Sequence, residues 1–428
     1  MGINGGTSFG SVRVARSAKA RALCLGLCAL GIALAASAGT PEMKFITFDV
    51  PAVGNLPGAG TGFLQGTGCF WNFFQSYDCS VILNESGTVT GYYVDQNYVG
   101  HGFVRSPNGT ITTFDEPEAN TSAYSFAGTF PTGVNDAGAI AGEYLDSGGL
   151  QHGFLRSPDG RFTTVDPSGS SFTSINGLNL QGAAVGWDAN GGIVQSYLRH
   201  PDGSFEAWTG PGQCETSPST NTDPLCYGGA ALGINVFGIV AGLYEDEQGV
   251  LHGLVRSLAG HLTAYDVPGA ATAPVEVAPG VYSPQGTGCP ACSSPINLWG
   301  AIGGYYTDSS SVVHGYLRSP SGSITKFDLP GPGCPSDCSM GLNDFGAITG
   351  YYSDANQIFH GFLRTPDGKL ISFDAPGAGT TTPGCFLPFF CEGTYPVSIN
   401  DAGVIAGYYV DANGTSHGFL LLAPEGGW

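Results

Sequence analysis

The sequence predicts an all-β fold, a seven-bladed β-propeller of four-stranded blades that is closed by pairing its N-terminal strand with the last blade. Three observations lead to this prediction. They are a repeated unit, the turn chemistry inside each unit, and two incomplete chain ends that complement one another. The predicted domain is a single one and covers residues 39–428.

The repeated unit opens with N-x-x-G-x-x-x-G. It continues, in its fullest form, through His-Gly-Phe-Leu-Arg, a Ser-Pro-Asp-Gly turn and a closing Phe-Asp. The opening residues are Asn84, Asn135, Asn179, Asn235, Asn297, Asn343 and Asn400. A repeat of this length with several short strands cannot bury a hydrophobic face alone and must stack on its neighbours. The array of repeats is therefore expected to be the fold.

The turns inside each unit predict four short antiparallel strands. Asn-Asp-Ala-Gly at 135–138 and 400–403 is typical of a tight hairpin, because its residues tolerate left-handed backbone. A second turn holds Asp-Ala-Asn-Gly at 411–414, and a third holds Ser-Pro-Asp-Gly at 157–160. Three turns joining four strands make the content of one propeller blade.

The chain ends indicate how the array is completed. The last unit stops after His-Gly-Phe-Leu at 417–420 and lacks a fourth strand, whereas residues 45–49 form an orphan strand, Phe-Ile-Thr-Phe-Asp. Pairing the two would fill the last blade and remove exposed sheet edges. An open solenoid is the alternative, and it leaves this complementarity unexplained.

The first 38 residues resemble a secretory signal peptide. Four basic residues precede an apolar run from Ala22 to Ala36, which ends in Ala-Ser-Ala at 36–38. A membrane anchor is the alternative, but spanning needs about 20 apolar residues. Without this segment the charge is 10 basic minus 34 acidic residues, or −24. Such a surface disfavours nucleic acid and anionic membranes as partners. From the signal-like segment we expect an extracellular or periplasmic protein with no membrane span after signal removal. We also expect a monomer.

Six histidines occupy equivalent positions and invite a metal interpretation. Counting back from the three-residue hairpin loop, however, places each histidine opposite an aspartate across two strands, which predicts structural hydrogen-bonded pairs. The pairs are His101–Asp115, His152–Asp166, His252–Asp266, His314–Asp328, His360–Asp374 and, across the closure, His417–Asp49. In the third unit Gln195 and Thr209 replace both members.

Ten cysteines lie in the variable linkers between units, two to a linker. In an oxidising compartment they predict five local disulfides. The pairs are Cys69–Cys79, Cys214–Cys226, Cys289–Cys292, Cys334–Cys338 and Cys385–Cys391. A zinc site formed by the four cysteines from Cys289 to Cys338 is the alternative.

Two of these linkers are also rich in aromatic residues, which makes them candidate ligand-binding loops. The residues are Trp71, Phe73, Phe74, Tyr77, Phe386, Phe389 and Phe390. The alternative is that they fold inward and plug the central channel. In a propeller, linkers and the turns between second and third strands emerge on one face, so the aromatic loops and the Asp-x-Asn turns should share it. That face would suit a neutral or cationic polyhydroxylated ligand.

The Asp-x-Asn turns themselves, such as 95–97 and 411–413, could ligate Ca²⁺ through oxygen atoms. None supplies the further carboxylates of an EF-hand loop, so hairpin chemistry is the preferred interpretation and no cofactor is expected. The sequence has no nucleophile elbow, phosphate loop or H-E-x-x-H motif, and no catalytic residue is assigned.

The repeat resembles the bacterial extracellular HAF-repeat family, whose His-Ala-Phe core follows an Asn-Asp-x-Gly-x-Ile-x-Gly stretch. The resemblance covers nearly the whole chain after residue 38, with His-Gly-Phe, His-Gly-Leu or His-Gly-Tyr as the core here, and it fails in the third unit. It implies secretion and a repeat fold but transfers no activity. We therefore expect a secreted non-catalytic module that binds a glycan or a surface protein. A secreted carbohydrate-active hydrolase or lyase with carboxylates at the propeller mouth is the alternative.

Overall fold

The structure is a computed structural model of the chain, and the residues it describes belong to one compact unit that begins at Glu42. The structure describes residues 43–50, 66–67, 69–71, 77–79, 81–95, 97, 99–122, 127–190, 193–211, 226–278, 281–283, 285–288, 293–331, 339–380 and 391–424. Every regular element in these ranges is a β-strand. No helix in the described part of the chain is long and apolar enough to cross a membrane.

The sequence repeats fold into antiparallel sheets whose strands follow one another in chain order. The first repeat forms β5 (Val81–Leu83), β6 (Val89–Val94), β7 (Gly100–Arg105) and β8 (Ile111–Phe114), and the second forms β9 (Thr129–Val134), β10 (Ile140–Leu145), β11 (Gln151–Arg156) and β12 (Phe162–Val165). The third repeat forms β13 (Phe172–Leu178), β14 (Ala184–Asn190), β15 (Ile193–Arg199) and β16 (Phe205–Trp208). The fourth forms β18 (Ala230–Ile234), β19 (Val240–Glu245), β20 (Val250–Arg256) and β21 (Leu262–Tyr265). The last three form β25 (Ile302–Thr307), β26 (Val313–Arg318) and β27 (Ile324–Phe327); β28 (Met340–Leu342), β29 (Ile348–Ser353), β30 (Phe359–Arg364) and β31 (Leu370–Phe373); β32 (Gly393–Ile399), β33 (Ile405–Val410) and β34 (Ser416–Leu422). Several four-stranded antiparallel sheets therefore make up the protein.

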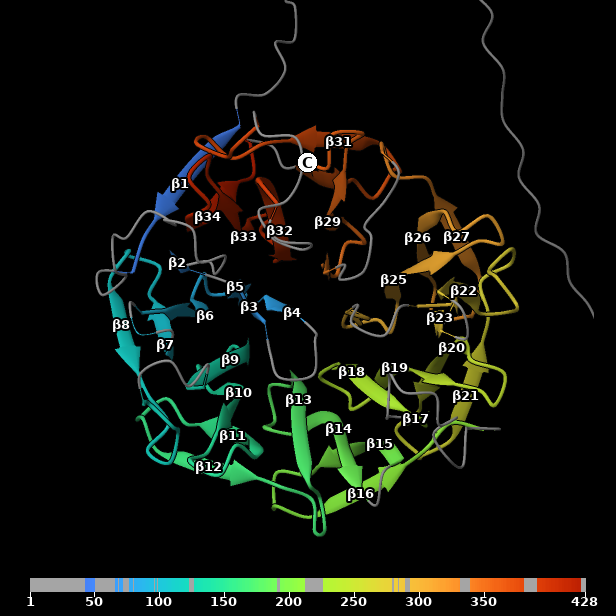
Figure 1. The fold of residues 1–428 in the computed structure, drawn as a ribbon, viewed down its shortest axis with the longest axis horizontal. Helices are drawn as coiled ribbons and strands as arrows, with labels where there is room; N and C mark the ends of the chain where they lie inside the picture. The colour runs from blue at the N-terminus through green and yellow to red at the C-terminus, as the bar shows by residue number, and fades with distance from the viewer. Residues whose placement is uncertain are drawn as a thin grey trace, which may run out of the picture. The chain divides into compact units, whose positions relative to one another are not determined.

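Within the unit that begins at Glu42, the sheets lie side by side around a central axis, with first strands such as β9 and β13 nearest the centre (Figure 1). The last strands, such as β12 and β16, lie at the rim (Figure 1). The fifth repeat departs from the expected four strands, because its first strand is reduced to a single bridge between Ile296 and Ile302. Pro295 precedes that bridge and has no backbone N–H to extend a ladder.

The orphan strand near the N terminus, β1 (Lys44–Phe48), pairs antiparallel with β34. The register runs from Lys44 opposite Leu422 to Phe48 opposite Gly418, so β1 takes the place of a fourth strand in the last repeat. The Phe45 ring packs against Phe419 with centroids 5.8 Å apart. The alternating pattern of Phe-Ile-Thr-Phe thus fits one edge of the last sheet.

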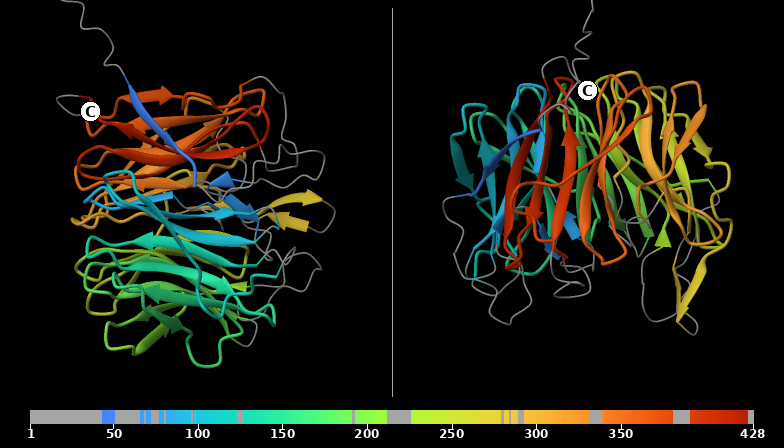
Figure 2. Two further views of the ribbon diagram at one scale, coloured as in Figure 1. Left: turned by 90° about the vertical axis from the view of Figure 1, so that its left-hand side faces the viewer. Right: turned by 90° about the horizontal axis from the view of Figure 1, so that it is seen from above.

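Short strands also form in the linkers: β2 (Gly66–Thr67), β3 (Cys69–Trp71), β4 (Tyr77–Cys79), β17 (Cys226–Tyr227), β22 (Val275–Ala278), β23 (Val281–Ser283) and β24 (Gln285–Gly286). Several of these linkers return along the preceding sheet and pair in parallel with its third strand, as β17 does with β15 and β24 with β20. The yellow β22–β23 hairpin projects from one face (Figure 2). Linker backbone therefore hydrogen-bonds to the third strand of the preceding sheet.

Glycine makes this close approach feasible. At Gly128 and Gly393 φ is 134° and 137°, and an added Cβ would lie only 2.0 Å and 2.2 Å from the carbonyl oxygens of Gly100 and Phe359. A side chain at either position would clash with backbone that cannot move aside. These contacts cross from one repeat to the next, where the sequence pattern alone gives no register.

A second contact between repeats involves the arginine that ends most third strands. Its guanidinium lies over an aromatic ring on the fourth strand of the preceding repeat, at 4.6 Å for Arg156 and Phe114 and 5.0 Å for Arg256 and Trp208. Arg105 of the first repeat lies 5.1 Å from the ring of Phe48, which belongs to β1 beside the last repeat. Cation–π contacts of desolvated arginines stabilise by about 1–2 kcal/mol, so they contribute to packing between sheets.

Candidate binding site

Six imidazole rings lie at equivalent places, near the start of third strands. Each Nδ1 hydrogen-bonds the aspartate that follows the opposing fourth strand, at 2.7–2.9 Å. The pairs are His101–Asp115, His152–Asp166, His252–Asp266, His314–Asp328, His360–Asp374 and His417–Asp49. The hairpin count puts the same residues opposite one another, because a three-residue loop fixes the register of both strands.

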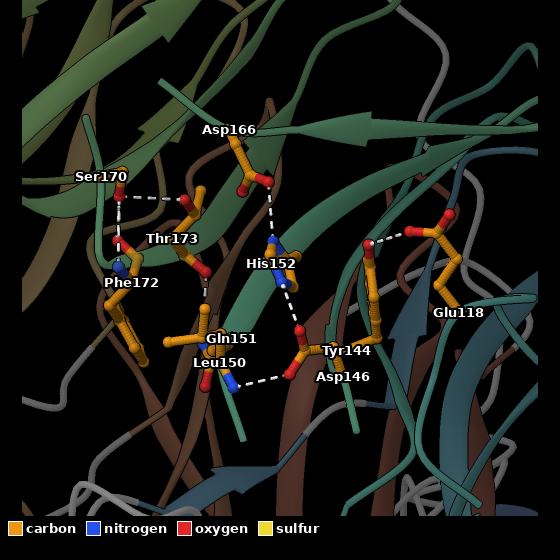
Figure 3. Close-up of polar contacts among 10 residues, drawn as sticks. All are labelled: Glu118, Tyr144, Asp146, Leu150, Gln151, His152, Asp166, Ser170, Phe172 and Thr173. Carbon is orange, nitrogen blue, oxygen red and sulfur yellow. Dashed lines mark hydrogen bonds and ion pairs between the residues drawn. The ribbon is translucent and has the colours of Figure 1, made fainter. Parts of the chain in front are cut away.

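A second carboxylate approaches each ring from the other side. It belongs to the turn between second and third strands, and its Oδ2 lies 3.2–3.9 Å from the histidine Nε2. Figure 3 shows this arrangement for His152 between Asp166 and Asp146. The imidazole also stacks on a tyrosine of the second strand, with centroids 5.0 Å apart for Tyr144 and His152. Each of the six sites is therefore an Asp–His–Asp triad on an aromatic platform.

The turn aspartates do two things at once. Oδ1 of Asp246 accepts the backbone N–H groups of Gln248 and Val250, both at 2.9 Å, which shapes the hairpin. Its Oδ2 is thereby aimed at His252 Nε2, 3.2 Å away. The hairpin interpretation of these aspartates explains the first contact, whereas the second contact was missed. Its only trace in the sequence is the constant interval of six residues between the two side chains.

At His101, His152, His252 and His417 the flanking carboxylates raise the pKa and so favour the protonated imidazole. At His101 and His417 the hydrogen bonds with Asp115 and Asp49 raise the pKa above its ordinary value, more than burial lowers it. At His252 burial is the largest single influence and lowers the pKa, but Asp246 and Asp266 together outweigh it and leave the pKa raised. A ring held in this way can present a charged N–H donor between two acceptors.

One triad opens onto a cavity of about 390 Å³. Its walls are Asp246, Gln248 and Val250 of one turn, His252 and Asp266 of the triad, and the loop 267–272. The volume lies within the usual range of small-molecule sites. The Asp266 side chain is 60% exposed and that of His252 is 18% exposed, so a ligand can reach both. The cavity combines charged acceptors, an imidazole and an amide with the apolar side chains of Val267 and Ala270.

The third repeat has no triad. Gln195 stands in place of histidine and donates from Nε2 to Oδ2 of Asp188 at 3.3 Å. Asp188 is fully buried, and burial raises its pKa. The register that pairs Ser196 with Trp208 places Gln195 beside Thr209, so this repeat is a natural variant of the site inside the same chain.

A different polar cluster occupies the opposite ends of the second strands. The opening asparagine of each repeat donates from Nδ2 to the backbone carbonyl of the next repeat's opening asparagine, at 2.9–3.3 Å. The series runs through Asn84, Asn135, Asn179, Asn235, Asn297, Asn343 and Asn400, and Asn400 donates to Asn84. The sequence identifies these residues as turn formers, but it does not indicate that their side chains reach the adjacent repeat.

Carboxylates follow four of these asparagines and accept backbone N–H groups of neighbouring turns. Glu85 Oε2 accepts from Asp401 N and Asp136 Oδ1 accepts from Glu85 N, both at 2.8 Å. Burial raises the pKa of Glu85 to about 7, with further contributions from the negative charges of Asp401, Asp136 and Asp344. Glu85 is therefore a carboxyl group that titrates near neutral pH.

Most of the aromatic residues that the sequence predicts to bind ligand lie outside the residues that the structure describes. Phe73, Phe74, Phe386, Phe389 and Phe390 lie outside the described residues. Trp71 and Tyr77 are opposite one another in the β3–β4 pair, where only backbone is described.

Most of the cysteines predicted to form disulfides also lie outside the described residues. Cys69 lies opposite Cys79 across β3 and β4, and Cys391 is buried. Cys226 lies in β17, and the remaining predicted partners lie outside the described residues. Among the residues that are described, no group of three or more His, Cys, Asp or Glu side chains is arranged to hold a metal ion.

No family model and no curated protein matches the chain. Among solved structures, the chain is similar to virginiamycin B lyase from Staphylococcus aureus, with 13% identity and a TM-score of 0.49 over 89% of this chain and 100% of that one. It is also similar to AofleA from Arthrobotrys oligospora, with 12% identity and a TM-score of 0.43 over 79% and 91% of the two chains. A six-bladed β-propeller lectin from Aleuria aurantia follows, with 10% identity and a TM-score of 0.38 over 69% and 93%. These are similarities of fold.

Proposed function

We propose that this protein is a secreted, non-catalytic binding module for a polyhydroxylated ligand, with a glycan as the preferred class. One observation carries the proposal. The Asp246–His252–Asp266 triad faces a cavity of about 390 Å³ on the end of the sheet where the linkers emerge. Sugar hydroxyls both donate and accept hydrogen bonds, and the triad and Gln248 offer acceptors and donors within one cavity.

The repeated structure favours several weak binding sites that act together on one ligand. Five further triads have the same geometry, so ligand-binding units would be displayed at fixed spacing around the axis. Several weak contacts to one polymer raise the overall affinity without any new contact. A neutral or cationic glycan fits better than an anionic one, because the chain carries a net charge of −20.

The scaffold we propose for these sites is a closed seven-bladed propeller. Three contacts support closure: β1 pairs with β34, Arg105 lies over Phe48, and Asn400 donates to Asn84. A ring leaves no unpaired sheet edge, which suits a protein outside the cell that must not aggregate. Secretion after loss of residues 1–38, the five disulfides and the monomeric state belong to the same proposal.

A second candidate function rests on Glu85. Its pKa of about 7, with three more carboxylates in the adjacent turns, is the environment of a general acid. This favours a hydrolase or lyase acting at the end of the axis that holds the asparagine turns.

An array of glycans and cell-wall fractions, with product analysis in the same wells, separates the two functions. Retention of a neutral or cationic glycan without any new product supports the binding module. Product that disappears in Glu85→Gln supports the enzyme. A protein that retains no glycan and forms no product contradicts both.

A further inference from the structure

Exposed aromatic side chains gather on the face that holds the asparagine turns. Phe237, Trp299 and Phe345 occupy the third position of the N-x-x-G turn in three consecutive repeats, and they are 59%, 66% and 68% exposed. The other four repeats have Ser86, Ala137, Gln181 and Ala402 at this position. The aromatic residues are thus confined to one side of the face.

Two leucines extend this apolar surface. Leu258, 74% exposed, lies in the turn between β20 and β21, and its Cδ1 is 3.5 Å from the place a Cβ would take on Gly238. Leu180, 48% exposed, follows the opening asparagine of the third repeat. We name Leu180, Phe237, Leu258, Trp299 and Phe345 the apolar arc. Large exposed apolar residues that lie close together on a soluble protein mark interaction sites more often than isolated ones do.

Hydrogen bonds hold the aromatic turns in place. Asn235 Nδ2 donates to the carbonyls of Asn297 and Leu298 at 3.2 Å and 3.3 Å, which ties the Phe237 turn to the Trp299 turn. Asn297 Nδ2 donates to Asn343 O at 3.1 Å, and this ties the Trp299 turn to the Phe345 turn. The three aromatic side chains therefore stand on a preorganised support, and a partner would not have to order the turns beneath them.

Carboxylates lie along another part of this face, which also carries the exposed Arg161 in the turn between β11 and β12. The second turn position holds Asp344, Asp401, Glu85 and Asp136 in four consecutive repeats counted around the asparagine series, and we name these residues the acidic arc. The two arcs meet at Asp344 and Phe345, which are neighbours in one turn. One oxygen of each carboxylate accepts a backbone N–H of an adjacent turn, as Asp344 Oδ1 does from Leu298 N at 2.7 Å.

We propose that this face docks a polypeptide that presents apolar side chains beside lysine or arginine. The apolar arc would receive the apolar side chains and the acidic arc the basic ones, which is charge complementarity across one interface. A second copy of this chain would add its own acidic arc to the interface, and an anionic lipid surface would be repelled. A neutral glycan would use the aromatic rings but leave the acidic arc without a role.

The docking face is separate from the triad cavity. The asparagine turns lie at one end of β19, between β18 and β19, whereas the triad turn joins β19 to β20 at the other end. A ligand in the cavity and a polypeptide on the two arcs could therefore be bound together. The proposal stands whether or not the cavity binds a glycan.

Fluorescence anisotropy with a synthetic peptide tests the docking face. The probe is a labelled amphipathic peptide of leucine and lysine, about 18 residues long, and a leucine–glutamate peptide is its control. The triple variant Phe237→Ala, Trp299→Ala, Phe345→Ala should bind the probe about tenfold more weakly. The matched control is Leu150→Ala with Val312→Ala, which removes apolar residues 51% and 40% exposed on turns at the opposite ends of the strands and should change affinity less than about twofold.

Charge is tested separately. The acidic arc is neutralised in a variant with Asp344→Asn, Asp401→Asn, Glu85→Gln and Asp136→Asn. Its affinity for the leucine–lysine peptide should be about tenfold lower and should depend less on salt concentration. Thermal unfolding of each variant checks that the fold is retained. The proposal is overturned by an unmodified protein that does not bind the peptide, or by equal losses in the triple variant and the matched control. It is also overturned if the triple variant loses retention of a neutral oligosaccharide, or dissociates from dimer to monomer in sedimentation, while its peptide binding is unchanged.

Discussion

Asn400 donates from its side chain to the backbone carbonyl of Asn84, 316 residues earlier, at 3.3 Å. The same contact joins each preceding pair of opening asparagines, so the last and first repeats are joined as any two neighbours are. Both side-chain atoms are used, because Asn400 Oδ1 also accepts the backbone N–H of Val404 at 3.0 Å. One residue therefore shapes its own turn and holds the adjacent one.

Replacing Asn400 with Ala should lower the free energy of unfolding by about 1–3 kcal/mol, because a buried carbonyl and a partly buried turn N–H lose their partner. Asn413→Ala is the matched control, since it removes an exposed asparagine from another turn of the same repeat. Urea denaturation of both variants measures the difference. Equal stability of the two variants would show that the contact between the last and the first repeat contributes nothing to stability.

His152 and Asp166 should couple in a double-mutant cycle. The two side chains are 23% and 34% exposed and hydrogen-bond at 2.7 Å, so a coupling energy of about 0.5–1 kcal/mol is expected after allowance for solvent screening. His152→Gln with Asp166→Thr mimics the natural pair of the third repeat. Strictly additive losses in a denaturation series would remove the claim that these residues act as a pair.

Stability should decrease as the pH rises through neutrality. The pKa of His101, His152, His252 and His417 is raised in the folded protein, so their pairs stabilise fully below the unfolded pKa, and this contribution is lost as the pH passes the folded pKa.

Glu85 acts in the same direction. Its folded pKa of about 7 exceeds the unfolded value of 4.5, so its ionisation costs stability as the pH rises between these values. The urea concentration at the unfolding midpoint should therefore decrease as the pH is raised from about 5.5 to about 8.5, and it should decrease less in Glu85→Gln. A midpoint that rises over this interval contradicts both assignments.

The aromatic linkers lead to a separate expectation. Changing Trp71, Phe73, Phe389 and Phe390 to Ala should weaken retention of the glycan found on the array, with little change in the melting temperature, because aromatic linkers would add contacts to a ligand that the triad cavity also holds. An early-melting variant that still retains the glycan would identify them as a plug of the central channel.

Contacts within a repeat could be predicted from the sequence, and contacts between repeats could not. The His152–Asp166 pair follows from counting along one hairpin, because turn type fixes register. The asparagine series, the Gly128 approach to Gly100 and the arginine–aromatic contacts all cross a linker of variable length, where no count applies. The apolar arc is visible in the sequence as Phe237, Trp299 and Phe345 at one turn position, but only the fold shows that these side chains are exposed together.

The central claim, ligand binding at the Asp–His–Asp cavity, is tested most directly by imidazole NMR. Long-range ¹H–¹⁵N spectra of the histidines are recorded during titration with the glycan found on the array, and the His252 signals are assigned by their loss in His252→Gln. Saturable movement of the His252 signals, with weaker glycan retention by His252→Gln and no product formed, is the result we predict. Glycan binding that leaves every imidazole signal in place, with affinity unchanged in His252→Gln, would contradict the account.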